Sequence, residues 1–160
     1  MAQKARRRLA PPLDAGGQMS LFQSLFGKRS KRSLEDSDFG RINERKPNNW
    51  EGNNFELWGY SSIQVILDGT PEGPTPEQRS FIKALRTNPE EIRERIERVV
   101  EQEARETASK PGSLKLTSIY LPEIPPDQMW RVWYDVEQED HYCYGAEIKG
   151  WQHIVPFTED

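Results

Sequence analysis

The sequence predicts an α+β fold: a mainly antiparallel sheet with two consecutive helices packed on one of its faces. Three observations predict it. Segments rich in aromatic and β-branched residues lie on both sides of a highly charged central stretch, and that stretch contains two helix-start signals. Five tryptophans, all after the first 49 of the 160 residues, supply large apolar surfaces for a core. The order strands, helices, strands favours helices layered on an antiparallel sheet.

The segments before the charged stretch are expected to form strands. Residues 38–42 open the ordered domain as a short strand, and a polar turn and Trp50 follow it. Segments 55–58 and 62–67 carry aromatic and β-branched residues between turn formers, which is typical of strands. The glycines and prolines of 68–74 then predict a turn.

Two helices are expected in the charged stretch. Thr75 has the features of an N-cap, with Pro76 at the first helical position and Gln78 completing a capping box. This helix should stop before Pro89, because a proline disfavours helical geometry in the residue that precedes it. Pro89 begins the second helix, over 89–108, whose outer Glu–Arg pairs predict a solvent-exposed face.

Strands are expected again after the helices. In 114–124 simple alternation places Leu116 and Tyr120 on one side of the strand, and Ile119 and Leu121 on the other. Segments 129–137 and 141–149 read as a hairpin around a turn at 138–140, with a last edge at 150–155. Trp130 and Trp133 alternate to opposite faces of the hairpin, so at least one of them is expected outside the core.

The charge distribution divides the chain into a basic tail, residues 1–37, and one acidic domain, residues 38–160. Residues 1–34 carry a net charge of +7, and the remainder carries −11. The acidic domain argues against a nucleic-acid partner and favours a basic protein. The single cysteine and the lack of a long apolar run favour a cytoplasmic location. Met19 is the expected natural start.

The tail contains a short amphipathic segment. Its apolar residues are spaced as on one face of a helix, and a basic cluster follows them directly. Such a segment could bring the protein to an anionic membrane or to an assembly, which is one alternative function. The candidate contacts are Leu21, Phe22, Leu25, Phe26, Lys28, Arg29, Lys31 and Arg32.

The hairpin 129–149 carries more aromatic residues than a sheet covered on one face needs to bury. Exposed tryptophan and tyrosine among carboxylates are typical of protein-docking surfaces. The expected function is therefore non-enzymatic protein binding, in an immunity-type or accessory role. The candidate partner-binding residues are Trp130, Trp133, Asp135, Glu137, Asp140, His141, Tyr142 and Tyr144.

An enzyme is the other alternative, using Asp135, Glu137 and His141 for metal binding or acid–base chemistry. The evidence for it is slight, because the acids border a turn and no second histidine lies at ligand spacing. Cys143 could act as a nucleophile only beside a positive group that stabilises its thiolate. There is no phosphate loop and no nucleophile-elbow motif, so we expect no catalytic residue, metal or cofactor.

The order of several short pieces resembles small bacterial domains of unknown function. The pieces are Phe39-Gly40, Trp50-Glu51-Gly52, Thr75-Pro76-Glu77-Gln78, Trp133-Tyr134-Asp135, Asp140-His141, Gly145 and Gly150-Trp151, within about 38–155. Such domains are encoded singly or near polymorphic toxin systems. The resemblance implies an immunity role and supplies no active-site residue.

Overall fold

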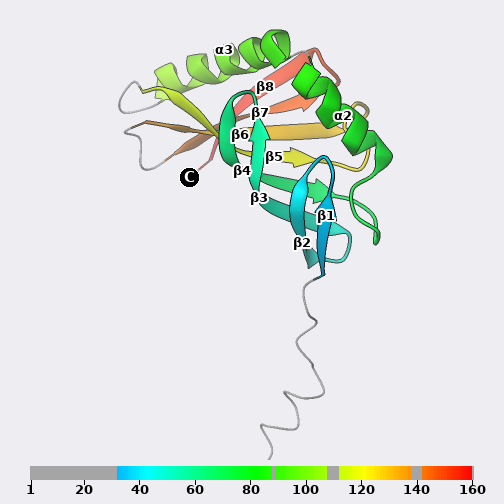
Figure 1. Ribbon diagram of the computed structural model, residues 1–160. Helices are drawn as coiled ribbons and strands as arrows, with labels where there is room; N and C mark the ends of the chain where they lie inside the picture. The colour runs from blue at the N-terminus through cyan, green and yellow to red at the C-terminus, as the bar shows by residue number, and fades with distance from the viewer. Residues whose placement is uncertain (1–31, 88, 108–111, 138–141, 160) are drawn as a thin grey trace, which may run out of the picture. The chain divides into compact units, whose positions relative to one another are not determined.

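A computed structural model describes residues 32–87, 89–107, 112–137 and 142–159. These residues form one eight-stranded sheet in chain order and two helices (Figure 1). The strands are β1 (Ser33–Asp36), β2 (Gly40–Lys46), β3 (Asn49–Leu57), β4 (Tyr60–Asp68), β5 (Leu114–Leu121), β6 (Met129–Val136), β7 (Cys143–Lys149) and β8 (His153–Glu159). The helices are α2 (Pro76–Thr87) and α3 (Pro89–Thr107). The mainly antiparallel α+β class is confirmed.

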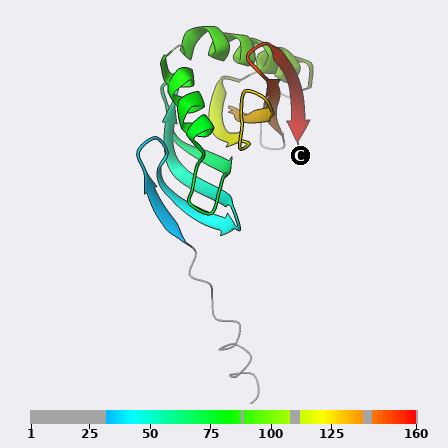
Figure 2. The ribbon, with the colours of Figure 1, turned by 90° about the vertical axis from the view of Figure 1, so that its right-hand side faces the viewer.

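The sheet contains one parallel pair, β4 with β5. Parallel neighbours need a crossover connection, and here the two helices provide it. All other neighbouring strands are antiparallel. Figure 2 shows that the sheet is strongly curved, with β1 and β8 at its two ends, as expected for twisted strands.

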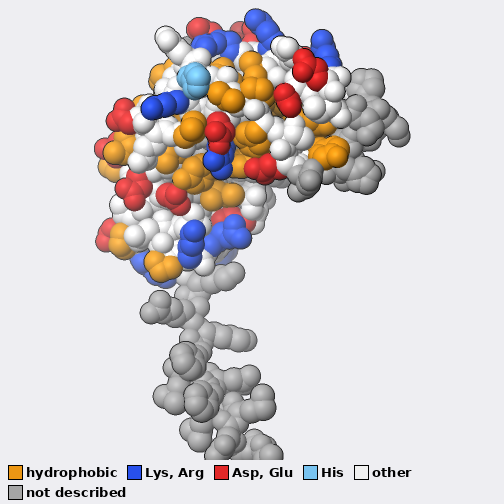
Figure 3. All heavy atoms as spheres, turned by 180° about the vertical axis from the view of Figure 1, so that it is seen from behind, with side chains coloured by type: hydrophobic (Ala, Val, Ile, Leu, Met, Phe, Trp, Pro, Cys, Tyr) orange, Lys and Arg blue, Asp and Glu red, His pale blue; other side chains and the backbone are white. Residues whose placement is uncertain are grey.

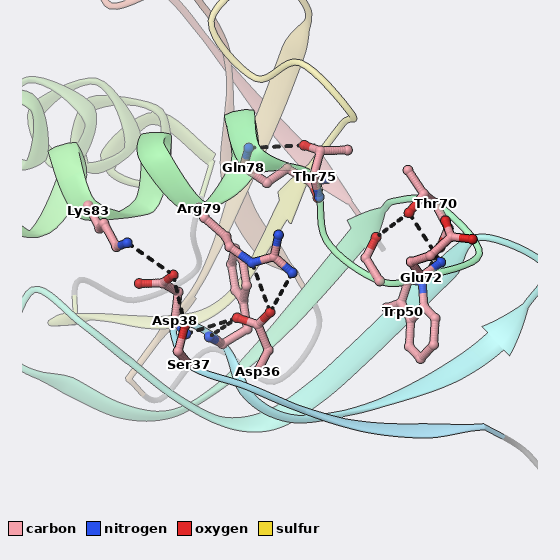
Figure 4. Close-up of polar contacts among 12 residues, drawn as sticks. Asp36, Ser37, Asp38, Trp50, Thr70, Glu72, Thr75, Gln78, Arg79 and Lys83 are labelled. Atoms are coloured by element: carbon pink, nitrogen blue, oxygen red, sulfur yellow. Dashed lines mark hydrogen bonds and ion pairs between the residues drawn. The ribbon is translucent and has the colours of Figure 1, made fainter.

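The capping box of α2 is confirmed (Figure 4). The Gln78 backbone N–H donates to Thr75 Oγ1 at 3.1 Å, and the Thr75 N–H donates to Gln78 Oε1 at 2.8 Å. The Gln78 side chain is fully buried, and its amide nitrogen also lies 2.8–3.2 Å from the backbone oxygens of Asp68, Leu121 and Pro122. One side chain thus joins the start of α2 to the ends of β4 and β5.

The sheet begins before Asp38, inside the segment that the sequence assigned to the tail. The strand expected at 38–42 is instead the turn between β1 and β2 followed by the start of β2. Asp36 holds this turn, because its carboxylate accepts the backbone N–H of Asp38 and the guanidinium of Arg79 on α2. Lys83 reaches Asp38 at 3.4 Å (Figure 4). Side chains of α2 therefore anchor the edge hairpin.

A bulge in β5 changes the expected alternation. The register with β6 shifts between Leu116 and Ser118. Leu116, Ile119 and Leu121 are consequently all buried, although simple alternation placed Leu116 opposite the other two. An extra residue in one strand moves every later side chain to the other face. The half-buried Tyr120 therefore lies on the side away from these three.

The core is one cluster to which strands and helices both contribute. From the strands come large side chains such as Trp50, Trp130, Tyr134 and Tyr144. The helices contribute Phe81, Ile82, Leu85, Ile92, Ile96, Val100 and Ala104. In the described part of the chain, neither helix is long and apolar enough to cross a membrane.

The candidate protein-binding face of the sheet

Several half-buried or exposed side chains share one surface of β4–β8, which we call the open face. Strand alternation and register place them there, pointing away from the core neighbours on the same strands. Figure 3 shows hydrophobic side chains in the middle of the surface turned away from the viewer of Figure 1, with charged side chains among them. The open face consists of Ile66, Tyr120, Arg131, Trp133, Asp135, Cys143, Glu147, Val155, Phe157 and Glu159.

Trp133 and Phe157 form an aromatic platform on this face. Gly145 pairs directly with both residues across the strands, Trp133 on one side and Phe157 on the other. A Cβ at Gly145 would overlap the Phe157 ring and the carbonyl of Val132, so only glycine leaves room for Phe157 to lie there. The two rings meet edge to face, with centroids 5.7 Å apart. The platform is partly exposed and well ordered by its neighbours.

A row of acidic residues borders the platform. Glu159 pairs across the strands with Cys143, and Asp135 lies on the other side of Cys143, next to the Tyr134–Tyr144 pair. Glu159 also accepts a hydrogen bond from Trp133 Nε1 at 3.1 Å. Burial raises the pKa of the Cys143 thiol, and the Glu159 and Asp135 charges raise that pKa further. Lys115 lies opposite Asp135 on β5, so two acidic groups and one basic group share this row, and its net charge is negative.

In the row on the other side of the platform, the polar side chains bond to one another. Arg131 forms an ion pair with Glu147, its direct cross-strand partner. Tyr120 donates to Asp68 at 2.6 Å. Burial and this hydrogen bond raise the pKa of Tyr120 to about 12. The charge on the open face is therefore uneven: paired around Arg131, and negative beside Trp133.

The residues predicted for partner binding divide into three groups. Trp130 and Tyr144 are fully buried, which corrects their assignment as contacts, because both alternate to the core side of their strands. Trp133 is partly exposed, Tyr142 is 39% exposed, and Asp135 and Glu137 are exposed at the end of β6. Asp140 and His141 lie outside the described residues, as does the expected turn at 138–140.

The predicted tail contacts lie almost entirely outside the described residues. This applies to Leu21, Phe22, Leu25, Phe26, Lys28, Arg29 and Lys31. Arg32 is described and exposed, and its guanidinium lies 5.6 Å from the ring centroid of Trp50. At that distance a cation–π contact ties Arg32 to the domain.

Two observations bear on the enzyme alternative. Cys143 has a raised pKa beside two carboxylates, the opposite of the environment that activates a thiolate. Among residues 32–87, 89–107, 112–137 and 142–159, no three His, Cys, Asp or Glu side chains gather closely enough to hold a metal ion. His141, on which the predicted site depends, is not among them.

Two hollows of the described surface are lined by arginines that already have structural partners. In the larger, about 470 Å³ beside the β3–β4 turn, Arg93 donates to Trp58 O and bonds Glu97 and Tyr60. In the smaller, about 240 Å³ beside Trp151, Arg95 donates to the carbonyls of Trp151 and Gln152. These arginines hold α3 against the hairpins, so neither hollow presents them as free ligand groups.

Several residues of the open face escaped the sequence analysis. Val155, Phe157 and Glu159 belong to β8, which was expected only as an edge over 150–155. The β-branched and aromatic residues of 154–158 were the available signal for a longer strand. No signal in the sequence pairs Phe157 with Trp133, because that contact depends on the order and register of three strands.

No protein-family model, curated protein or solved structure is similar to the chain.

Proposed function

We propose that this protein works by binding another protein through the open face and catalyses no reaction itself. The observation that carries the proposal is the Trp133–Phe157 platform, partly exposed on the open face over β6–β8 with charged groups around it. Protein interfaces commonly combine aromatic anchors at the centre with a polar rim. Val155, 43% exposed, and the half-buried Ile66 extend the apolar area across the strands.

The proposal includes an arrangement in which α2 and α3 both pack on the opposite face of the sheet. Its support is that the buried side chains of both helices belong to the same cluster as the inward side chains of the strands. In this arrangement the helices leave the open face uncovered over β4–β8, and a partner can approach it directly.

Binding to the face fits this sheet better than adding a strand to its edge at β8. Pro156 lies in the middle of β8 and has no N–H to donate. It pairs with Ala146, so its nitrogen must point to the free edge. That edge therefore lacks a central donor, as in strands that resist edge-to-edge pairing. The side chains of the face are the better contact groups.

The partner proposed here is a basic protein. Residues 35–160 carry a net charge of −11, which favours association with positively charged surfaces. An immunity-type or accessory role in a bacterial cytoplasm is the form of this function that the resemblance to small bacterial domains suggests.

Affinity capture with matched variants tests the proposal. Immobilised full-length protein and its Trp133→Glu and Trp151→Glu variants are incubated with an extract of the native host, and retained proteins are identified by mass spectrometry. Trp151 is a suitable control because it is 38% exposed but lies beside Phe81 and α3, away from the open face. Circular dichroism checks that both variants fold.

The expected result is one protein retained near one-to-one by the wild type and by Trp151→Glu, and lost from Trp133→Glu. Capture by the wild type alone does not count as support, since any exposed surface can retain proteins from an extract. Retention that survives Trp133→Glu contradicts binding through the open face. Failure to retain any stoichiometric protein under gentle conditions contradicts the function itself.

A further inference from the structure

The negative end of the open face combines two features that recognise the same chemical group. Asp135 and Glu159 flank Cys143 on neighbouring strands, so their backbones are about 10 Å apart at the usual strand spacing. The Trp133 and Phe157 rings lie one row away, two residues earlier on the same strands. We call these five residues the acidic–aromatic seat.

The geometry of the seat brings a carboxylate to the edge of an aromatic ring. Trp133 Nε1 donates to Glu159 Oε2 at 3.1 Å, which holds that carboxylate beside the indole. A cation above the indole face would therefore lie near a negative charge as well as near the ring electrons. Both interactions favour the same position for a positive group.

No ion pair in the described part of the chain involves Asp135 or Glu159, whereas Arg131 and Glu147 in the next row neutralise each other. The charges that raise the pKa of the Cys143 thiol come from Glu159 and Asp135, and no cation of the described residues opposes them. Lys115 is the nearest basic residue by register, opposite Asp135 on β5. The seat thus carries excess negative charge.

We propose that the acidic–aromatic seat receives an arginine side chain from the basic protein partner, which rests on the function proposed above. Arginine suits the seat better than lysine does. Its planar guanidinium can stack on an indole face and at the same time donate two parallel hydrogen bonds to a carboxylate. The compact ammonium of lysine can do only one of these well.

Peptide titration of the full-length protein tests this directly. The probes are acetylated tetra-arginine amide and its uncharged isostere, tetra-citrulline amide, at low ionic strength because salt screens exposed charges. The signal is the indole N–H resonance of Trp133, assigned from its loss in Trp133→Phe. Tetra-arginine should move this resonance more than any other indole resonance, and tetra-citrulline should not.

Isosteric variants separate the seat from general attraction to an acidic protein. Asp135→Asn/Glu159→Gln should weaken tetra-arginine binding about three- to tenfold, because two charge contacts are removed. Glu94→Gln/Glu101→Gln removes the same charge from exposed positions on α3 and should leave the affinity unchanged. Equal weakening by both pairs, or an unmoved Trp133 resonance, overturns the proposal.

Alkylation of Cys143 checks that the carboxylates lie where the structure places them. At pH 8 the double variant Asp135→Asn/Glu159→Gln should react faster with iodoacetamide than the wild type, because removing two negative charges lowers the thiol pKa. An unchanged rate contradicts the seat geometry.

The two proposals fail in distinguishable ways. If tetra-arginine does not bind the seat while Trp133→Glu still abolishes partner capture, the arginine proposal is wrong and the proposed protein binding is supported. If tetra-arginine binds the seat while Trp133→Glu leaves partner capture unchanged, the arginine-binding seat is supported and the proposed function is wrong.

Discussion

Replacing Gln78 by glutamate tests how α2 is joined to the sheet. A capping box accepts glutamate as readily as glutamine, because only a side-chain oxygen is needed to receive the N-cap N–H. In this protein the Gln78 amide nitrogen also lies within hydrogen-bond distance of three backbone oxygens, those of Asp68, Leu121 and Pro122. Gln78→Glu keeps the cap and removes that donor.

The expected loss is large for a single isosteric change. An amide has two N–H protons, so the substitution removes two hydrogen bonds and leaves buried carbonyl oxygens without a donor. Each loss should lower the free energy of unfolding by about 1–3 kcal/mol. The introduced carboxylate is also buried against those carbonyl oxygens, which adds to the cost. The free energy of unfolding should fall by about 3–5 kcal/mol. With a urea dependence of about 2 kcal/mol per M, the midpoint should drop by about 2 M.

Urea denaturation at several pH values measures this loss. Burial raises the folded-state pKa of the introduced carboxyl above its unfolded value, so the deficit is smallest at low pH and grows as the pH rises through the folded-state value. Gln128→Glu is the matched control, because Gln128 is exposed and uses only its oxygen, accepting from the Ile124 N–H. A deficit below 1 kcal/mol, or one that grows on acidification, would refute the reasoning.

Three further changes, the first with Glu35→Ala as its control, probe other parts of the molecule. Asp36→Ala should lower the free energy of unfolding by about 2–4 kcal/mol in urea denaturation, because this nearly buried carboxylate accepts two backbone N–H groups and a guanidinium. Glu35→Ala, in an exposed ion pair at 3.8 Å, should change it by less than about 0.5 kcal/mol. Tyr120→Phe should reduce the loss of stability at alkaline pH. The pKa of Tyr120 is raised to about 12, so the neutral phenol stabilises the fold fully below pH 10 and loses that contribution as the pH approaches 12. Gly145→Ala should cost about 1–3 kcal/mol and change the near-ultraviolet circular dichroism, because its Cβ would displace Phe157. An unchanged spectrum and midpoint would mean that Phe157 does not depend on this glycine.

Features that depend on residues close together in the chain could be predicted from the sequence. The Thr75–Gln78 capping box and Pro89 predicted where α2 begins and where α3 replaces it, and both helices begin at the predicted prolines. Alternation along 129–136 predicted that Trp130 and Trp133 face opposite ways, and one is buried while the other is partly exposed. These signals are local, so a single sequence carries them.

Contacts between residues that are distant in the sequence became known only from the tertiary structure. The β5 bulge reversed the expected facing of Ile119. β1 pairs with β2, and Arg79 of α2 bonds Asp36 at the end of β1. The platform of the open face forms because β8 pairs with β7, which brings Phe157 next to Trp133. Strand order and register set these contacts, and a shift of one residue would point every side chain the other way. The fold class depends on local signals and could be predicted from the sequence. The candidate site depends on strand order and register, so it could be predicted only in part.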